Sequence, residues 1–343
     1  MVRLGTDGEW PLFYALNFVF FKRDNLDAFA RIDAPSFHYK YLPLYHPIMH
    51  RKSFIKLMGL TPLALGMTDL QGLYTMGQSL GATERMPVLF LGHGSPMNAI
   101  EENEFVQGFR NIAKTLPKPK AILCVSAHWF TKGTKVTAME LPPTIYDFGG
   151  FPKALYEVKY PAKGNPELAA ETKELLQPTA VELDQKWGLD HGAWTVIMHL
   201  YPKADVPVIQ LSIDYTQPAQ YHYDLAKQLA VLRNKGVLII GSGNIIHNLG
   251  LVDFQNFHKD NYGFDWAIEA RASINGYLQS GNYQPLIDYR QQSKAYQLAI
   301  PTPDHYLPLL YTLGLQQKDE TLSLFNDKLV AGSLSMTSVV VKS

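Results

Sequence analysis

The chain has 343 residues, of which 46% are hydrophobic and 18% are charged, as in an ordinary globular protein that can bury a sizeable core. Lys and Arg together number 31, as do Asp and Glu, so the formal net charge is zero. This balance argues against a nucleic-acid partner and a charged tail, and it favours a small molecule as the ligand.

Residues 1–85 are expected to be an extension outside the main domain. Residues 1–48 are rich in aromatic side chains and show no clean helix or strand period. Residues 49–67 begin with basic side chains and continue as an apolar stretch too short to span a bilayer, so no stable membrane insertion is expected. This layout is similar to a twin-arginine export signal with one Arg replaced by Lys. Two interpretations stay open: a natural start at Met49, or a genuine extension with an amphipathic helix near 53–65.

The main domain is expected over residues 86–343, where apolar runs alternate with helical patterns. Strands are predicted over 87–91, 121–125, 206–213, 237–240 and 333–341. Helices are predicted over 102–116, 165–176, 218–235 and 264–278. The alternation predicts an α/β fold, a layered αβα arrangement with a central, mostly parallel mixed sheet. The active site is expected at the carboxyl ends of the strands.

A histidine follows each of three predicted strands. His93 comes after the first, His128 after the second, and His247 after 237–240 and a glycine-rich turn. Because ligand sites in open α/β sheets form at the carboxyl ends of strands, these side chains are expected to converge. The one cysteine, Cys124, lies in an apolar run and is expected in the core, so histidine and carboxylate would have to hold any metal. An isolated histidine is more often structural, and from spacing alone that alternative stays open.

Two further histidines lie in turns. His191 follows Asp190 before an apolar segment, and an imidazole there can act as a general acid or base; an Asp-capped turn facing solvent is the alternative. His305 lies in a loop stiffened by prolines, which suits a substrate contact or support for a ligand, although plain loop structure explains it equally well. The other histidines are interpreted as surface or core residues: His38, His46, His50, His199, His222 and His258.

Five short motifs occur in order across about residues 86–342. They are Gly92-His93-Gly94-Ser95-Pro96, Ser126-Ala127-His128-Trp129, Leu189-Asp190-His191-Gly192-Ala193-Trp194, Gly241-Ser242-Gly243-Asn244 with His247-Asn248, and Pro303-Asp304-His305-Tyr306. Each is weak alone, but together they resemble the class III extradiol ring-cleavage dioxygenases, in particular the DOPA 4,5-dioxygenase branch of bacteria and plants. The N-terminal 85 residues lie outside the resemblance.

The resemblance implies one divalent metal, held by His93, His128 and His247. It implies that His191 is the acid/base residue, with a place as fourth ligand as the alternative, and that His305 lines the site. Many enzymes of the class bind iron(II) with two His and one Glu, whereas an all-histidine site suits Zn²⁺ as well as Fe²⁺. Iron(II) is expected for O2 chemistry, because zinc is redox-inert.

The implied reaction is extradiol cleavage of a catechol, L-DOPA or a similar aromatic diol, with O2 to a muconic semialdehyde. His191 would remove a catechol proton and later return one. Aromatic side chains in 146–151, with Trp129 and Trp194, would wall the pocket, or else pack in the core. The resemblance implies a cytoplasmic enzyme. If residues 49–67 act as an export signal, the enzyme is expected in the periplasm instead. A zinc-dependent hydrolase and a non-catalytic metal-binding protein on the same fold are the alternatives, and the sequence does not indicate an oligomeric state.

Overall fold

The structure, a computed structural model, describes residues 85–343. The expectations for a start at Met49, an export-like segment at 49–67 and a helix near 53–65 lie outside the described residues. Among the described residues, no helix has both the length and the apolar character that crossing a membrane requires.

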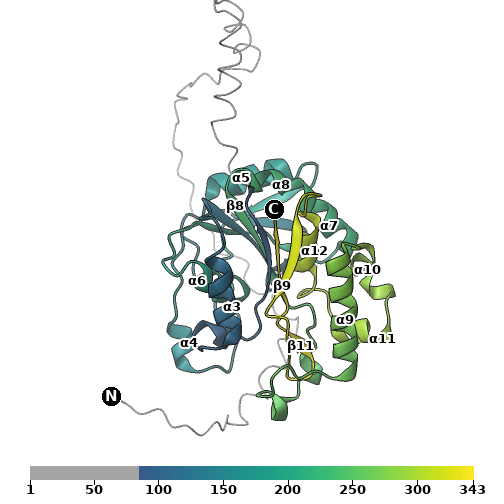
Figure 1. Cartoon of the computed structure of the whole chain (residues 1–343). Helices are drawn as coiled ribbons and strands as arrows, with labels where there is room; N and C mark the ends of the chain where they lie inside the picture. Colours follow the sequence, from purple (N-terminus) through teal and green to yellow (C-terminus); the bar gives the residue numbers. More distant parts are fainter. Residues whose placement is uncertain (1–84) are drawn as a thin grey trace, which may run out of the picture. The chain divides into compact units, whose positions relative to one another are not determined.

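A six-stranded sheet forms the centre of the described chain (Figure 1). In spatial order its strands are β6 (Val208–Gln210), β2 (Ala121–Ser126), β8 (Val237–Gly243), β1 (Val88–Gly92), β12 (Ser338–Lys342) and β9 (Thr321–Phe325). Neighbours from β6 to β1 are parallel, while β12 is antiparallel to both β1 and β9. The register places Val88 opposite Ile239 of β8 and opposite Val341 of β12. The predicted mixed, mostly parallel sheet is confirmed.

Short paired strands and the helices make up the rest. The pairs are β3 (Phe130–Thr131) with β7 (Ile213–Asp214), β4 (Thr134–Thr137) with β5 (Val181–Asp184), and β10 (Leu329–Val330) with β11 (Leu334–Ser335). The α-helices are α3 (Glu104–Ala113), α4 (Lys153–Glu157), α5 (Pro166–Leu175), α6 (His191–Leu200), α7 (Ala219–Gln228), α8 (Ala230–Arg233), α9 (Asp265–Ser280), α10 (Gln284–Ile287), α11 (Lys294–Ala299) and α12 (Leu307–Gly314). The 3₁₀ turns are η2 (Pro96–Ala99), η3 (Leu249–Leu251), η4 (Phe254–Asn256) and η5 (Tyr289–Gln291).

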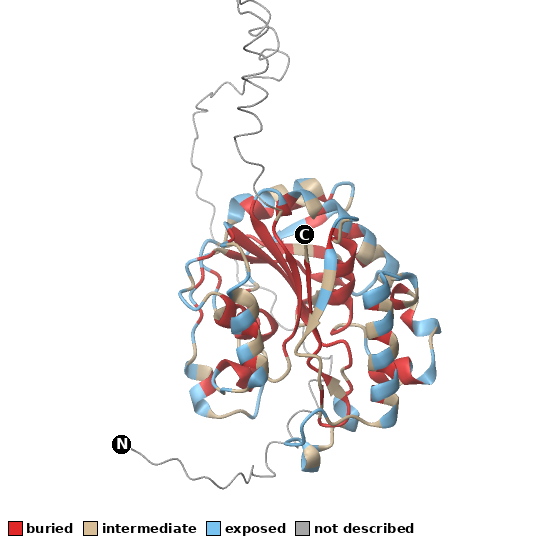
Figure 2. Cartoon of the chain, in the orientation of Figure 1, coloured by how far each residue is buried: buried red, intermediate tan, exposed pale blue. Residues whose placement is uncertain are grey.

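The sheet separates two hydrophobic cores. Along β1, Val88 and Phe90 point into the core shared with α7, α9 and α12, whereas Leu89 and Leu91 point into the core shared with α3 and α6. This alternation explains the unbroken apolar run, because both faces of the strand are buried. Figure 2 shows buried strands in the middle and helices whose outer faces are exposed. The layered αβα arrangement is therefore confirmed.

Several element boundaries differ from the prediction. Predicted strand 206–213 breaks after Gln210, because Leu211 forms an isolated bridge with Val136 and the chain then pairs with β3 through Ile213 and Asp214. Predicted helix 218–235 is interrupted at Leu229, where 3₁₀-type hydrogen bonds replace the α-helical ones. Strand β8 extends through Gly243, three residues beyond the predicted end. Cys124 is buried, as expected.

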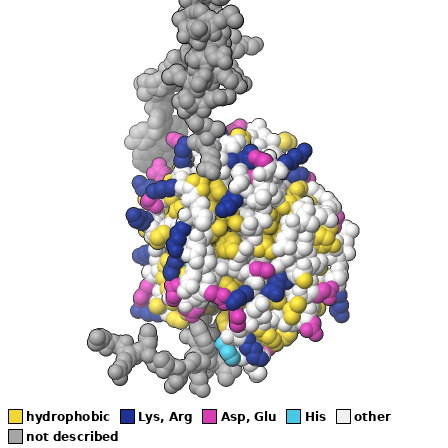
Figure 3. Space-filling model, viewed as in Figure 1, with side chains coloured by type: hydrophobic (Ala, Val, Ile, Leu, Met, Phe, Trp, Pro, Cys, Tyr) yellow, Lys and Arg dark blue, Asp and Glu magenta, His cyan; other side chains and the backbone are white. Residues whose placement is uncertain are grey.

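The face seen in Figure 3 carries Lys and Arg side chains interspersed with Asp and Glu, and hydrophobic side chains lie between them. On this face the two signs of charge are therefore mixed rather than gathered in separate patches. Such mixed surfaces are typical of globular proteins and do not resemble the basic stripe of a nucleic-acid binder.

Candidate functional site

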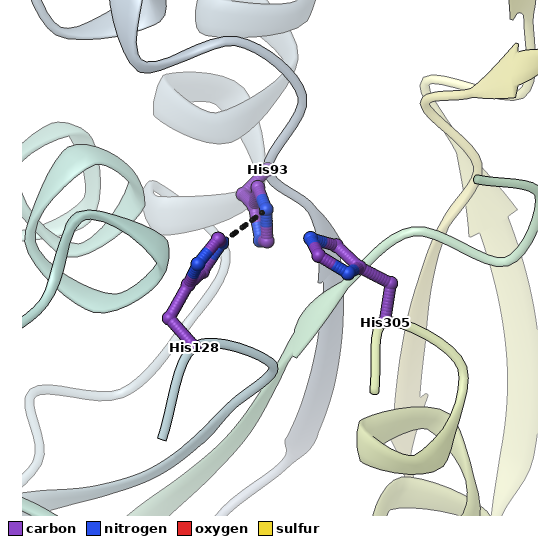
Figure 4. Close-up of side chains that lie close together, drawn as sticks. All are labelled: His93, His128 and His305. Carbon is purple, nitrogen blue, oxygen red and sulfur yellow. Dashed lines mark hydrogen bonds between the residues drawn. The ribbon is translucent and has the colours of Figure 1, made fainter. Parts of the chain in front are cut away.

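Five histidines come together where strands end and helices begin. His93 directly follows β1 and His128 lies two residues after β2, whereas His247 lies four residues after β8. His191 is the first residue of α6, and His305 lies just before α12. Figure 4 shows His93, His128 and His305 pointing toward one another. The cluster therefore gathers segments from both layers of helices and from three central strands.

His93 and His128 form the closest pair of the cluster. Their Nε2 atoms lie 3.2 Å apart, as the dashed line in Figure 4 marks. The Nδ1 of His93 lies 3.0 Å from the hydroxyl of Ser242, which donates its own hydrogen to the Gly192 carbonyl. The hydroxyl must therefore accept from His93, so Nδ1 carries the proton and the Nε2 lone pair is free.

This pair fits a bound metal. Two nitrogens that each lie 2.0–2.1 Å from a tetrahedral ion are about 3.3 Å apart, close to the observed separation of the two Nε2 atoms. Burial, followed by the charges of neighbouring histidines, holds the pKa of both imidazoles well below the ordinary value, so both are neutral near pH 7, the form in which an imidazole can bind a metal. His305 completes the group: one nitrogen of each ring lies within 4.8 Å of the others.

His247 stacks on His305, which in turn lies beside His93 and His128. The two rings stack with centroids 3.5 Å apart and planes 10° from parallel. Among residues 85–343, the possible ligand atoms of His247, Asp304 and His305 lie within 4.8 Å of one another, and His247 forms no such group with His93 and His128. Burial and the neighbouring His305 hold the pKa of His247 well below its ordinary value. The structure thus brings His93 and His128 together and offers two stacked imidazoles beside them.

His191 faces a carboxylate that the sequence did not single out. Its ring centroid lies 3.8 Å from that of His128, and its Nδ1 lies 3.0 Å from Asp147 Oδ1. Burial alone would raise the pKa of Asp147, but its interactions with the backbone N–H and the nearby imidazole of His191 outweigh this and hold the pKa below the ordinary value. The signal for Asp147 was only its position as the single carboxylate in the aromatic loop at 142–152.

Asp190 fixes the start of α6 and hence the place of His191. Its buried carboxylate accepts from the Ala193 amide at 3.1 Å, from Ser126 Oγ at 2.6 Å and from Gln210 Nε2 at 2.6 Å. The Asp-capped turn is therefore present, but the imidazole that follows it is buried, with 6% of its surface exposed, rather than facing solvent.

The aromatic residues divide between the site and the core. Phe148 presents an edge to His191, with centroids 5.4 Å apart. Trp194 is fully buried and donates its indole N–H to the Ile145 carbonyl, so it packs in the core. Trp129 stacks on Trp187, with centroids 5.9 Å apart. Phe148 is thus the member of this set that contacts an imidazole of the cluster.

Comparisons with known proteins identify relatives that match most of the described chain. The family described as the catalytic LigB subunit of aromatic ring-opening dioxygenase matches residues 86–341. The chain is 47% identical over 268 residues to a 4,5-DOPA dioxygenase extradiol of Escherichia coli K12, covering 76% of this chain and 96% of that protein. It is 37% identical over 257 residues to one of Beta vulgaris, covering 73% and 94%. A crystal structure of an uncharacterized protein from Escherichia coli K12 is 43% identical, with a TM-score of 0.64, covering 75% of this chain and 99% of that one.

Proposed function

Because the chain belongs to the family of aromatic ring-opening dioxygenases with a LigB catalytic subunit, we propose that its histidine cluster opens the ring of L-DOPA or a closely similar catechol. The protein is a metal-dependent extradiol dioxygenase: it breaks the ring carbon–carbon bond beside the two hydroxyls, and both atoms of O2 enter the product. The observation that carries the proposal is the pair of imidazole Nε2 atoms 3.2 Å apart, a separation suited to two ligands of one ion.

His93, His128 and His247 are the metal ligands in this proposal. Ser242 fixes the proton of His93 on Nδ1, which leaves Nε2 for the ion. Of the stacked pair, His305 already pairs through Nδ1 with Asp304, which suits it to a substrate contact and leaves His247 as the third ligand. The metal is iron(II), which when bound supplies the activation of O2 that redox-inert zinc lacks.

His191 holds and moves the proton. In the proposed reaction its Nε2 accepts a proton from a catechol hydroxyl, while Asp147 beside Nδ1 stabilises the resulting positive charge. The proton is later returned to oxygen as the ring opens. Burial of the imidazole keeps bulk water away from this transfer, and the edge of Phe148 borders it.

Loading the metal-free protein with either ion under anaerobic conditions tests the function. After L-DOPA and air are added, the iron(II)-loaded protein should consume one O2 per ring opened and form a yellow semialdehyde, and the zinc-loaded protein should do neither. Catechol and dopamine in the same assay define the substrate. If the iron-loaded protein takes up no O2 with any of the three, the proposal is wrong.

Metal content tests the ligand set. His247→Ala should lower bound metal to well below one ion per chain, as His93→Ala should, because each removes one of three ligands. His305→Ala should keep the metal and lose turnover. Retention of the metal by His247→Ala together with its loss from His305→Ala would assign the third position to His305 instead.

A further inference from the structure

One carboxylate lies between the acid/base histidine and a proposed metal ligand. Asp147 Oδ1 accepts the backbone N–H of His191 at 2.8 Å and lies 3.0 Å from its Nδ1. The other oxygen, Oδ2, lies 3.3 Å from Nδ1 of His128. The carboxylate therefore faces the same nitrogen of both imidazoles, on the side of each ring away from its Nε2.

We propose that Asp147 is a positioning residue for ring cleavage: it holds the Nδ1 protons of His128 and His191, so that one Nε2 is free for the metal and the other for the substrate proton. The proposal rests on the proposed function. A neutral imidazole has one N–H, and a carboxylate beside Nδ1 places it there. Without the carboxylate, each ring is free to carry its proton on Nε2, where it would block both tasks.

Unsatisfied polar atoms support this role. Within the described part of the chain, Asp147 Oδ2 and His191 Nδ1 are buried and lack a well-aligned hydrogen-bond partner, although the carboxylate lies close to both rings. Buried polar groups without a partner are rare in native structures, and a catalytic role is one explanation for them. Catalytic hydrogen bonds are often poorly aligned before the substrate binds and tighten afterwards. The position of the Asp147 carboxylate between the two imidazoles fits this behaviour.

The loop that carries Asp147 is anchored without it. The Ile145 amide donates to the Leu189 carbonyl at 2.7 Å, and the Tyr146 hydroxyl donates to the Val158 carbonyl at 2.6 Å. In Asp147→Asn the side-chain oxygen can still accept the His191 backbone N–H, so the local fold is expected to persist. The substitution thus removes the charge and the second acceptor, and little else.

The experiment compares Asp147→Asn and Asp147→Glu with Asp184→Asn. Asp184 is a matched control, since its side chain is 12% exposed against 17% for Asp147 and it caps a turn at the Lys186 and Trp187 amides. Zinc affinity by chelator competition, imidazole tautomers by long-range ¹H–¹⁵N correlation in the zinc-loaded protein, and steady-state O2 uptake are measured for each.

Asp147→Asn should weaken zinc binding roughly tenfold and lower kcat on the order of a hundredfold, with KM for the catechol little changed. It should also move the His191 proton from Nδ1 to Nε2. Asp147→Glu should keep the Nδ1 tautomer and recover kcat to within about tenfold of the wild type, while Asp184→Asn should stay within about twofold.

Four results would overturn the proposal. They are an unchanged tautomer in Asp147→Asn, equal effects in Asp184→Asn, complete loss of metal from Asp147→Asn (which would make Asp147 a ligand), and a folded Asp147→Glu as impaired as Asp147→Asn. If the wild type cleaves no catechol, while Asp147→Asn still shifts the tautomer and weakens zinc binding, the positioning role stands and the proposed function fails.

Discussion

Gly243→Ala should damage the active site although it adds only one methyl group. An added Cβ at Gly243 would lie 2.1 Å from the carbonyl oxygen of His305. Real Cβ contacts are essentially never under 3.0 Å, so strand β8 and the His305 backbone must separate by about 0.9 Å. Such overpacking costs roughly 1–3 kcal/mol of the free energy of unfolding. A shift near 1 Å at a reacting group costs on the order of a hundredfold in rate.

Thermal unfolding and O2 uptake by the iron-loaded protein check this. We expect a lower Tm, by roughly 2–10 °C, and a kcat reduced about a hundredfold. Gly276→Ala in α9 is the control, because its Cβ meets nothing within 4 Å and alanine favours a helix, so its Tm should rise slightly with kcat unchanged. A Gly243→Ala enzyme with wild-type Tm and kcat would show that the contact is not tight and refute the reasoning.

Three further predictions concern buried ionisable side chains. His191→Ala should keep its metal and lower kcat by roughly 10²–10⁴, and metal analysis of the purified variant would reveal a ligand role if the ion is lost. Arg233→Met should cost up to about 3–5 kcal/mol in urea unfolding, since it leaves Arg85, 3.4 Å away, as the one cation beside the buried Glu320 carboxylate within residues 85–343, and a cost under 1 kcal/mol would contradict this. Burial lowers the pKa of His222 to about 4, so between pH 6.5 and 4 the unfolded chain binds a proton that the folded protein does not. The free energy of unfolding should therefore fall by roughly 3 kcal/mol as the pH drops from 6.5 toward 4. His222→Gln should flatten that part of the stability profile, and identical profiles for the two proteins would count against it.

The elements predicted best were those whose signal is local. Strand β1 was visible as a short, unbroken apolar run because both of its faces are buried. Helix α5 was visible through its cap, and the structure confirms that Asn165 accepts from the Leu168 amide. By contrast, α12 is buried on all sides, so its residues show no amphipathic period and the helix escaped prediction.

The candidate site was predictable only in part for the same reason. That His93 and His128 lie together follows from β1 and β2, which both run parallel to the β8 strand between them and end at the same edge of the sheet. The stacking of His247 on His305 depends on how the loop before α12 crosses the end of β8, which no local pattern encodes. Asp147 likewise reaches the cluster through tertiary contacts of an irregular loop. The ligand roles of His93, His128 and His247 are predictions that metal analysis of their alanine variants tests.

The division of the interior by the sheet bears on how this enzyme can evolve. His191 begins a helix that packs in one core, and His305 precedes a helix that packs in the other. Substitutions that are well separated and share no neighbours add their effects, so the two layers can drift nearly independently. Mutations accumulating in one layer would then adjust the proton-transfer side of the site, and those in the other the stacked histidine pair. In directed evolution, substitutions in the two helix layers could therefore be screened in separate libraries, and the most active variants from each could then be combined.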